Sequence, residues 1–503
     1  MATNQLIEDN NNSKTRYYYV DQYGAMVKNT WKAVAMDDNS GDDVNAEYWW
    51  YYFGSDGKAY TSEDDLTTSE IKTINGQKYA FDSEGHMLYG WINKDNVEQQ
   101  DNDDEAWKTS QYFFNGWNDG HMQTGWLQLT VEDDNETKTY WFNFKNDGKK
   151  RANARKKING SYYHFADDGH MITGWGTATA TVKDSSATSG ELSYVNGDGA
   201  ERKNKWVWAV PDEDSVETDL KNDYDDDEYS WWYFNNSGKL VTNQIKKING
   251  KKYAFDYYGR MIKGFVFVDN SGNVVDYKDA GDWTRAEIIK GHQDEKDLTI
   301  YSTGDFYYFS NDEEKDGSMK KGYQNLELDD GTYQFYFSTS NGKAYNEYVS
   351  KIKKYVKNGL VLAPSNDDDS NYAAVIVDAN NAPDLDANNE CLVFAEKTEG
   401  NILVNKAGTV VKKKAKLKDS NDGYYIVNKD GVVLRYFKSE DDYKDYVGYT
   451  TSKDADKSIS ITTAMLNLTN KSDLDKEVKE AKEAKMATGD TDKWAGKYES
   501  SEA

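Results

Sequence analysis

The stretch Ile74-Asn75-Gly76-Gln77-Lys78-Tyr79-Ala80-Phe81-Asp82, which continues through Gly85-His86-Met87 to Gly90-Trp91, occurs three times in closely similar form. The second copy runs from Ile158 to Trp175 and the third from Ile248 to Phe265, so the copies start 84 and then 90 residues apart. Self-similarity at a nearly constant period indicates a repeat architecture, because one small unit cannot bury its own apolar face and must stack on the next.

The first copy has the local chemistry of a β-hairpin. Asn75 and Gly76 both tolerate positive φ, which a two-residue type I′ turn requires. After the turn, Tyr79 and Phe81 are two residues apart and therefore share one face of the strand. Gly85 then lets the chain turn back. We expect each unit to be a short hairpin followed by a return segment that carries a large aromatic residue.

The composition agrees with a thin stack of such units. Hydrophobic residues make up 37% of the 503 residues, yet aromatic residues make up 14%. Each aromatic side chain buries roughly 150–250 Å², so few residues can hold a layer together. We therefore predict an all-β fold, an elongated solenoid of stacked β-hairpin repeats, with a small mixed C-terminal region that contains one short helix.

Four segments are expected along the chain. Residues 1–16 are predicted to be a disordered lead-in, and residues 17–350 carry the aromatic-rich repeats with acidic insertions. In residues 351–440 the aromatic positions become aliphatic, which predicts degenerate repeats that act as a cap or spacer. Residues 441–503 are expected to form a strand at 458–462, a short charged helix at 473–487 and a tail. That helix could dock on the repeats or on a protein partner, or it could be a solvated tail.

Charge and cysteine content exclude several function classes. The formal net charge is −27, which disfavours nucleic acid and anionic membrane surfaces. No stretch approaches the 18 apolar residues of a membrane-spanning helix, and residues 1–13 lack the apolar core of a secretory signal. Cys391 is the single cysteine, so there is no disulfide framework, and we expect it to be a small buried apolar residue.

No motif indicates catalysis, a metal or another cofactor. His86, His121 and His170 occupy one repeat position, where Arg260 and Ser318 stand in other copies, so we interpret it as a solvent-facing turn position. His164 and His292 have no partner at metal-ligand spacing. The acidic runs 101–105 and 223–228 lack the spacing of a one-loop calcium site and are interpreted as solvated loops. Phosphate loops, nucleophile elbows and zinc-protease motifs are absent from the sequence.

The repeated aromatic residues are the candidates for a binding site. A flat aromatic face beside polar groups suits the apolar face of a pyranose ring, and it also suits a quaternary ammonium group. Phe81, Phe165 and Phe255 are interpreted as packing between hairpins. Trp91, Trp126 and Trp175, which end the return segments, are either packing residues or ligand-binding residues.

The pattern Ile-Asn-Gly-Lys-Lys-Tyr-Ala-Phe-Asp followed by Gly-x-Met-x-x-Gly-Trp resembles the cell-wall-binding repeat family. That family includes choline-binding modules, the glucan-binding modules of glucansucrases and the carbohydrate-binding repeats of clostridial toxins. The resemblance covers about residues 17–345, and weakly extends to 436. It implies a hairpin solenoid without catalysis that binds ligands in shallow sites between hairpins.

The resemblance also assigns ligand-binding positions. An aromatic box in the choline-binding type is built from the Trp of the Gly-Trp pair and the first aromatic of the hairpin strand. With the tyrosines of the Asn-Gly hairpins, the candidate residues are Trp50, Tyr79, Trp91, Trp126, Tyr163, Trp175, Trp231 and Tyr253. Lys78 and Lys252 replace a box aromatic and would repel a cation there, so these units look more like glucan-binding and toxin repeats.

The sequence therefore predicts a non-enzymatic protein, secreted or attached to the cell surface, that binds a glucan or a bacterial cell-wall polysaccharide at several weak sites. The alternative is a structural or attachment protein, such as a phage virion component or a surface adhesin. In that case the repeats would be a spacer and the C-terminal region would contact a protein partner. An enzymatic partner on a longer precursor is a third alternative.

Overall fold

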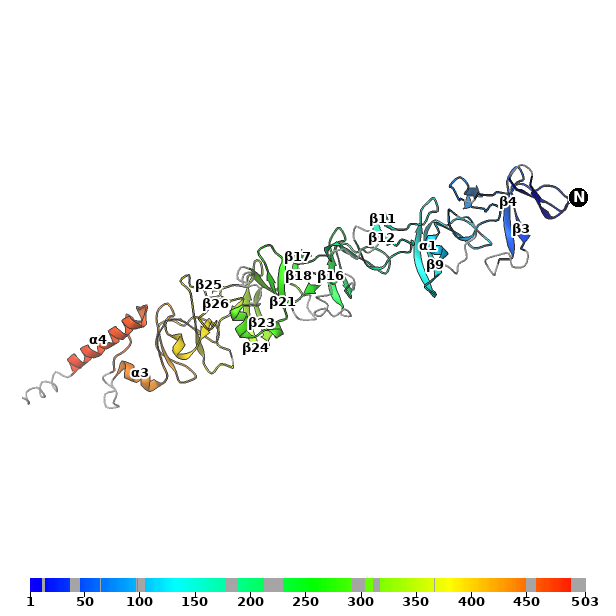
Figure 1. The fold of residues 1–503 in the computed structure, drawn as a ribbon. Coiled ribbons are helices and arrows are strands. Elements are labelled where there is room, and N and C mark those ends of the chain that lie inside the picture. Colours follow the sequence, from blue (N-terminus) through cyan, green and yellow to red (C-terminus); the bar gives the residue numbers. More distant parts are fainter. Residues whose placement is uncertain are drawn as a thin grey trace, which may run out of the picture. The chain divides into compact units, whose positions relative to one another are not determined.

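The computed structural model describes residues 1–10, 14–36, 46–63, 65–95, 97, 105–177, 189–211, 229–291, 304–310, 317–365, 367–448 and 458–489 (Figure 1). The chain divides into two compact units, Met1–Val241 and Thr242–Ala503.

The first unit is a series of two-stranded antiparallel sheets, each made of two consecutive strands. Its elements are β1 (Gln5–Asp9), β2 (Arg16–Val20), β3 (Thr30–Ala35), β4 (Tyr48–Phe53), β5 (Lys72–Ile74), β6 (Gln77–Tyr79), β7 (Gly90–Ile92), α1 (Ala106–Thr109), β8 (Tyr112–Phe114), β9 (Gly125–Asp133), β10 (Glu136–Phe144), β11 (Ala154–Ile158), β12 (Ser161–Phe165), β13 (Gly174–Thr177), β14 (Leu192–Val195), β15 (Lys205–Ala209) and β16 (Ser230–Phe234).

The second unit has larger sheets of three or five strands, and it carries three helices in its described part. Its elements are β17 (Gln244–Ile248), β18 (Lys251–Phe255), β19 (Met261–Ile262), β20 (Gly264–Val268), β21 (Val274–Lys278), α2 (Arg285–Lys290), β22 (Asp305–Phe309), β23 (Gly322–Leu328), β24 (Gly331–Phe337), β25 (Glu347–Val349), β26 (Lys354–Lys357), β27 (Leu360–Val361), β28 (Tyr372–Val375), β29 (Leu392–Val393), β30 (Ile402–Asn405), β31 (Lys414–Lys418), β32 (Tyr424–Val427), β33 (Val433–Phe437), α3 (Glu440–Val447) and α4 (Lys471–Gly489).

The predicted Asn-Gly turns are confirmed. Asn75 and Gly76 have φ of 51° and 86°, and both residues of the turns at 159–160 and 249–250 also have positive φ. These turns close β5–β6, β11–β12 and β17–β18, which we call the Asn-Gly hairpins. Two positive φ angles in succession define a type I′ turn, whose twist matches that of the strands it joins.

The return segments hold successive hairpins together. Met87 bridges back to Phe81 of its own hairpin, and its backbone N–H donates to the carbonyl of Trp50 in the preceding hairpin at 2.8 Å. The same donation joins Met171 to Trp141 at 2.7 Å. The predicted stack of hairpins is thus confirmed within the first unit, where backbone hydrogen bonds connect neighbouring hairpins.

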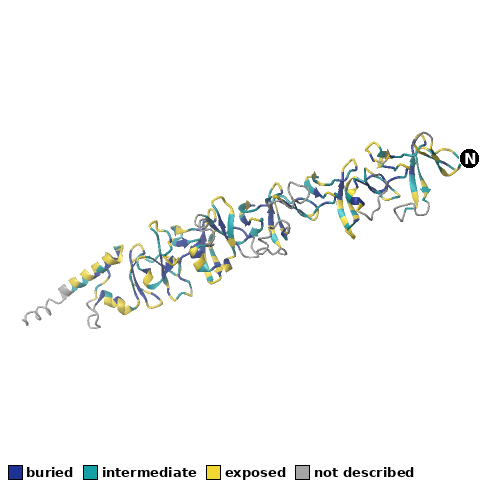
Figure 2. Cartoon of the chain, in the orientation of Figure 1, coloured by how far each residue is buried: buried dark blue, intermediate teal, exposed yellow. Residues whose placement is uncertain are grey.

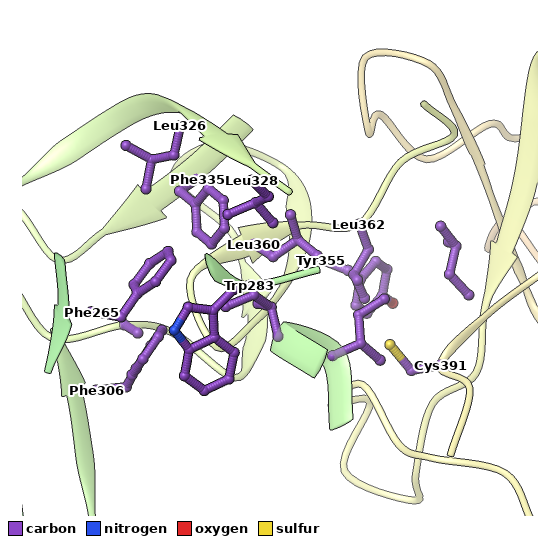
Figure 3. Close-up of a cluster of buried hydrophobic side chains, with 14 of the residues drawn as sticks. Phe265, Trp283, Phe306, Leu326, Leu328, Phe335, Tyr355, Leu360, Leu362 and Cys391 are labelled. Atoms are coloured by element: carbon purple, nitrogen blue, oxygen red, sulfur yellow. The ribbon is translucent and has the colours of Figure 1, made fainter. Parts of the chain in front are cut away.

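The two units differ in how they bury apolar residues. In the first unit, separate small clusters lie between neighbouring hairpins. In the second, one cluster extends from β20 to β30 and includes Trp283, which lies beside Phe265 and Phe306 in Figure 3. Cys391 is fully buried in this cluster, as predicted, and burial raises the pKa of its thiol to about 12. The thiol is therefore protonated at neutral pH.

The C-terminal helix is present and is longer than expected, and it packs on this chain's own residues. Although much of α4 is exposed (Figure 2), Leu474 and Val478 are buried against residues of β32, β33 and α3. Arg435 of β33 donates to both carboxylate oxygens of Asp475, each at 2.8 Å. A helix with buried leucine and valine and a bidentate ion pair is a docked helix, not a solvated tail.

Two local predictions were wrong. Residues 5–9 of the expected disordered lead-in form β1, because Leu6 and its neighbours pair with β2 and satisfy that strand's backbone groups. Residues 458–462 form no strand, although their polar and apolar residues alternate. Ile459 and Ile461 instead pack against the α3–α4 cluster, where the segment has no partner strand.

Candidate functional site

Exposed aromatic side chains gather on three hairpins of the first unit. These are β3–β4, β9–β10 and β15–β16, which we call the platform hairpins, and each directly precedes an Asn-Gly hairpin in the sequence. Their exposed aromatic residues are 40–53% accessible, namely Tyr48, Trp141, Trp208, Tyr229 and Trp231. Single exposed aromatic residues are common, but several gathered on one hairpin form a candidate interaction surface.

Strand register places the exposed aromatics of each platform hairpin on one face, together with partly buried aromatic residues. In β3–β4, Trp31 pairs with Tyr52, and Trp50 follows two residues away from Tyr52 on the same face. In β15–β16, Trp208 pairs with Trp231. We call these faces the first, second and third platforms, in chain order, with β9–β10 as the second.

The second platform combines aromatic rings with polar groups. The Trp126 ring lies 4.8 Å from Tyr163 of the next hairpin and 6.4 Å from Trp141 of its own. Trp126 pairs across the strands with Asn143, which is 4% exposed, and Arg151 donates its Nε hydrogen to Asn143 Oδ1 at 2.8 Å. One aromatic surface thus has an amide and a guanidinium at its edge.

The first platform has aromatic rings where the second has these polar groups. Tyr52, which pairs with Trp31, takes the place of Asn143. Tyr60 takes the place of Arg151, because the Tyr60 N–H donates to the Tyr52 carbonyl as the Arg151 N–H donates to the Asn143 carbonyl. Trp31 lies 5.2 Å from Tyr52 and 4.9 Å from Tyr79. This platform therefore has tyrosine rings at the two positions where the second has an amide and a guanidinium.

The third platform is the most exposed. Trp208 lies 5.2 Å from Trp231 and stacks on Tyr229 at 6.0 Å, and more than half of the Trp208 and Tyr229 side chains is accessible. Trp206 lies 6.3 Å from Trp231 on the same face. Four aromatic rings on one short hairpin provide a flat, polarizable surface.

The Trp91 position, by contrast, is closed. Trp91 is 3% exposed and is surrounded by Phe113, Phe142 and Phe144 at 4.9–6.1 Å. The ammonium group of Lys150 lies 5.1 Å from its ring centre and also donates to the backbone carbonyl of Trp107 in α1. Burial lowers the pKa of Lys150 to about 8.

The predicted site residues divide according to this geometry. Tyr79, Trp126 and Tyr163 are partly exposed and lie at the first and second platforms, Trp231 is exposed at the third, and Trp50 is partly buried at the first. Trp175 is also partly buried, and its indole N–H donates to the carbonyl of Val210 at 2.8 Å. Trp91 and Tyr253 are buried at 3% and 8% exposure, so neither ring is accessible in this structure, and their role in ligand binding stays a prediction.

Sequence reasoning missed other residues of the platforms. The missed residues are Trp31, Tyr48, Trp141, Trp206, Trp208 and Tyr229. One signal was available: Trp141 stands three residues before Phe144, as Trp50 does before Phe53 and Trp231 before Phe234. Trp31 and Trp206 stand two residues after Asn29 and Asn204, which have positive φ, whereas in a Gly-Trp pair the positive-φ glycine stands directly before the Trp.

The Gly-His-Met position was interpreted as a solvent-facing turn position, but His86 and His170 pack against an aromatic ring of the preceding hairpin. The His86 side chain is 12% exposed, its Nδ1 lies 2.8 Å from the Asp82 carboxylate, and its ring stacks on Trp49 at 4.2 Å. His170 likewise contacts Asp168 and stacks on Tyr140. The turn carboxylate binds the ring, and the preceding hairpin supplies the aromatic face, so these residues connect hairpins.

His164 has a partner that the sequence did not suggest. It is 2% exposed and contacts Glu201 at 3.0 Å, while Arg155 donates twice to the same carboxylate. Burial raises the pKa of Glu201, but hydrogen bonds from His164 and Arg155 outweigh it and bring the pKa to about 2. Glu201 stands at the repeat position that Met87 and Met171 occupy in other units, so a carboxylate replaces a thioether there.

The described residues contain no group of three or more His, Cys, Asp or Glu side chains arranged to hold a metal ion. The acidic runs 101–104 and 223–228 and His292 lie outside the residues that the structure describes. Within the described part, no helix is long and apolar enough to cross a membrane.

Two streptococcal proteins align with the chain. Glucosyltransferase-S of Streptococcus mutans is 25% identical over 293 residues, which cover 55% of this chain and 16% of that protein. Glucosyltransferase-I of Streptococcus downei is 24% identical over 353 residues, which cover 69% of this chain and 16% of that protein. The chain thus spans 16% of the length of these relatives.

Solved structures also align with the chain, with low overall superposition. CbpJ from Streptococcus pneumoniae TIGR4 has 17% identity and a TM-score of 0.27, with coverage of 66% of this chain and 100% of that chain. Choline binding protein F from Streptococcus pneumoniae has 20% identity and a TM-score of 0.23, with coverage of 69% and 89%. No established family profile matches the chain.

Proposed function

Because this chain is built of repeats of the glucan-binding and cell-wall-binding family, we propose that it is a non-enzymatic protein that binds a glucan or a bacterial cell-wall polysaccharide through its platforms. The observation that carries this proposal is the exposure of aromatic rings on the same face of three hairpins. An exposed Trp or Tyr ring can stack on the apolar face of a pyranose, and the polar groups beside it can bond the hydroxyls.

Three platforms on one chain favour multivalent attachment. Each platform is a shallow surface and is expected to bind weakly. A polymer that engages a second platform after a first does so as an intramolecular step, which can raise avidity by about 10² to 10⁴ without a new contact. We place the protein outside the cell or at its surface, where such polysaccharides are found.

The alternative is an attachment protein in which the repeats are a spacer and the C-terminal region binds a protein. The described part of α4 gives this alternative little support, because Leu474 and Val478 are buried in this chain's own core. The carbohydrate proposal accounts for the exposed aromatics, and the spacer alternative does not.

Affinity electrophoresis tests the proposal. The intact chain is run in gels that contain dextran, starch or purified cell-wall polysaccharide, with and without free choline. We expect retardation by at least one polymer, relieved by its soluble oligosaccharide. The triple variant Tyr48→Ala, Trp141→Ala, Trp208→Ala removes an exposed ring from each platform and should abolish the retardation, while each single variant should weaken it less.

Tyr23→Ala is the matched control, because Tyr23 is 76% exposed and lies outside the platforms. It should leave mobility in every gel unchanged. If the triple variant and Tyr23→Ala migrate like the unmodified chain in a gel that retards it, the platforms are not the binding surface. If no polymer retards the chain, the spacer alternative is favoured.

A further inference from the structure

The second platform differs from the first in charge as well as in polarity. From residue 145 to 160 the sequence has seven basic residues and one acidic residue, in a chain whose formal net charge is −27. The matching segment of the first platform, residues 54–76, has two basic residues and five acidic ones. The second platform is therefore bordered by a local excess of positive charge.

Two of these basic side chains border the aromatic rings. Lys156 pairs across the strands with Tyr163, so both lie on the same face of β11–β12, and Tyr163 contacts Trp126. Arg151 uses its Nε hydrogen on Asn143, and its two terminal nitrogens make no hydrogen bond within the described residues. Lys156 is exposed and forms no ion pair with a described carboxylate.

Other basic groups nearby already have partners within the chain. Arg155 and Lys203 pair with Glu201, and Lys150 is buried against Trp91. Among the remaining basic groups, Arg151 lies beside Asn143, the cross-strand partner of Trp126, and Lys156 lies beside Tyr163 on the platform side of β11–β12, whereas Lys157 lies on its opposite face.

From this arrangement we propose that the second platform binds a glycan that carries an anionic substituent, such as the carboxylate of a uronic acid. This inference rests on the proposed function and specifies the ligand class of one platform. A pyranose ring stacks on Trp126 and Trp141, and the carboxylate accepts hydrogen bonds from the Arg151 guanidinium and the Lys156 ammonium. A planar guanidinium suits a carboxylate because its N–H groups can donate in parallel.

Dextran and carboxymethyl-dextran of matched chain length provide the test, since they share a backbone and differ in the carboxylate. The unmodified chain should bind carboxymethyl-dextran more tightly, and the preference should shrink as salt is added. The double variant Arg151→Gln, Lys156→Gln should weaken binding of carboxymethyl-dextran by about tenfold or more while dextran binding changes by less than about twofold.

Two controls make the result specific. Lys72→Gln removes the cross-strand equivalent of Lys156 from the first platform, where Lys72 pairs with Tyr79, and it should not change the preference. Poly-aspartate supplies negative charge without sugar rings and should bind weakly.

Each outcome decides the inference. Equal losses for both dextrans, or no initial preference, would overturn it while leaving the proposed function intact. Binding of poly-aspartate as tight as that of carboxymethyl-dextran would overturn it, because charge alone would suffice. Binding of neither dextran by the unmodified chain, together with no binding of any wall polysaccharide, would overturn both proposals.

Discussion

Trp91 and Trp126 begin from the same sequence signature and reach opposite environments. Both follow a glycine with positive φ, both stand at the second position of a first strand, and both pack against two aromatics of the next hairpin. Yet Trp91 is 3% exposed, whereas Trp126 is partly exposed beside the accessible Trp141. The Gly-Trp pair therefore fixes a packing position but not whether a ligand can reach it.

Residues outside the repeat pattern close the Trp91 position. Trp107, in the single helical turn α1, packs on Phe142 at 5.9 Å and donates its indole N–H to the carbonyl of Glu132. Lys150 then occupies the space over Trp91 with its ammonium group. In the equivalent position of the neighbouring units stand Met122 and Met171. The chain thus places its own cation against this aromatic cluster, where another unit places a thioether.

The largest expected effect separates packing from surface. Trp91→Ala should destabilise the first unit by about 3–5 kcal/mol, because it leaves a large cavity in a closed cluster. Trp141→Ala, at 41% exposure, should cost less than about 1 kcal/mol. Urea denaturation followed by far-UV circular dichroism measures both. Comparable losses for the two variants would contradict the division into a closed and an open position.

The hairpins and their inward faces could be predicted because they depend on short-range backbone chemistry. Two adjacent positive φ angles favour Asn-Gly strongly, and alternation then places Phe81 inside, where it is 1% exposed. The resemblance of the repeats to a binding family was likewise readable from the fixed positions.

The openness of each aromatic cluster could not be predicted, since it depends on contacts between segments that the repeat pattern does not align. Trp107 lies in an insertion between repeats, and Lys150 replaces the methionine that stands at this repeat position in the neighbouring units. Neither residue, taken alone, predicts that Trp91 is buried. The burial of His86 has the same origin, because Trp49 of the preceding hairpin supplies the ring on which it stacks. Trp208 and Tyr229 belong to no repeated motif and emerge only from strand register.

Replacement of the buried lysine gives the second effect. Lys150→Met restores the residue type of the neighbouring units and removes a buried ammonium, so we expect the first unit to gain about 1–3 kcal/mol at pH 7. The pKa of Lys150 is lowered from 10.5 to about 8 in the folded chain, so the unfolded chain binds the proton more tightly. The cost of burying the charge is therefore full below pH 8 and disappears as the pH rises to 10.5.

The advantage of Lys150→Met over the unmodified chain should accordingly shrink between those pH values. Urea midpoints of the two proteins at pH 7, 9 and 10.5 would record this trend. A Lys150→Met variant that is less stable at pH 7, or an advantage that grows with pH, would mean that attraction to the Trp91 ring exceeds the cost of burial.

The smallest effect concerns the packing of the Lys150 side chain against Gly169. Gly169 and Gly160 have nearly equal φ of 92° and 93°, so an alanine meets the same backbone strain at either place. A Cβ at Gly169 would approach Lys150 Cδ to 2.7 Å, whereas a Cβ at Gly160 meets nothing within 4 Å. Gly169→Ala should therefore cost about 1–2 kcal/mol more than Gly160→Ala, and the excess measures the packing of the Lys150 stem.

The same pair of glycine substitutions in a Lys150→Ala background completes a double-mutant cycle. Without the long side chain, the alanine at position 169 has room, so the difference between the two glycine variants should vanish. A difference that persists would assign the cost of Gly169→Ala to its backbone rather than to Lys150. An equal cost in the unmodified background would show that the lysine stem moves freely, in which case the aromatic residues around Trp91 close the position without it.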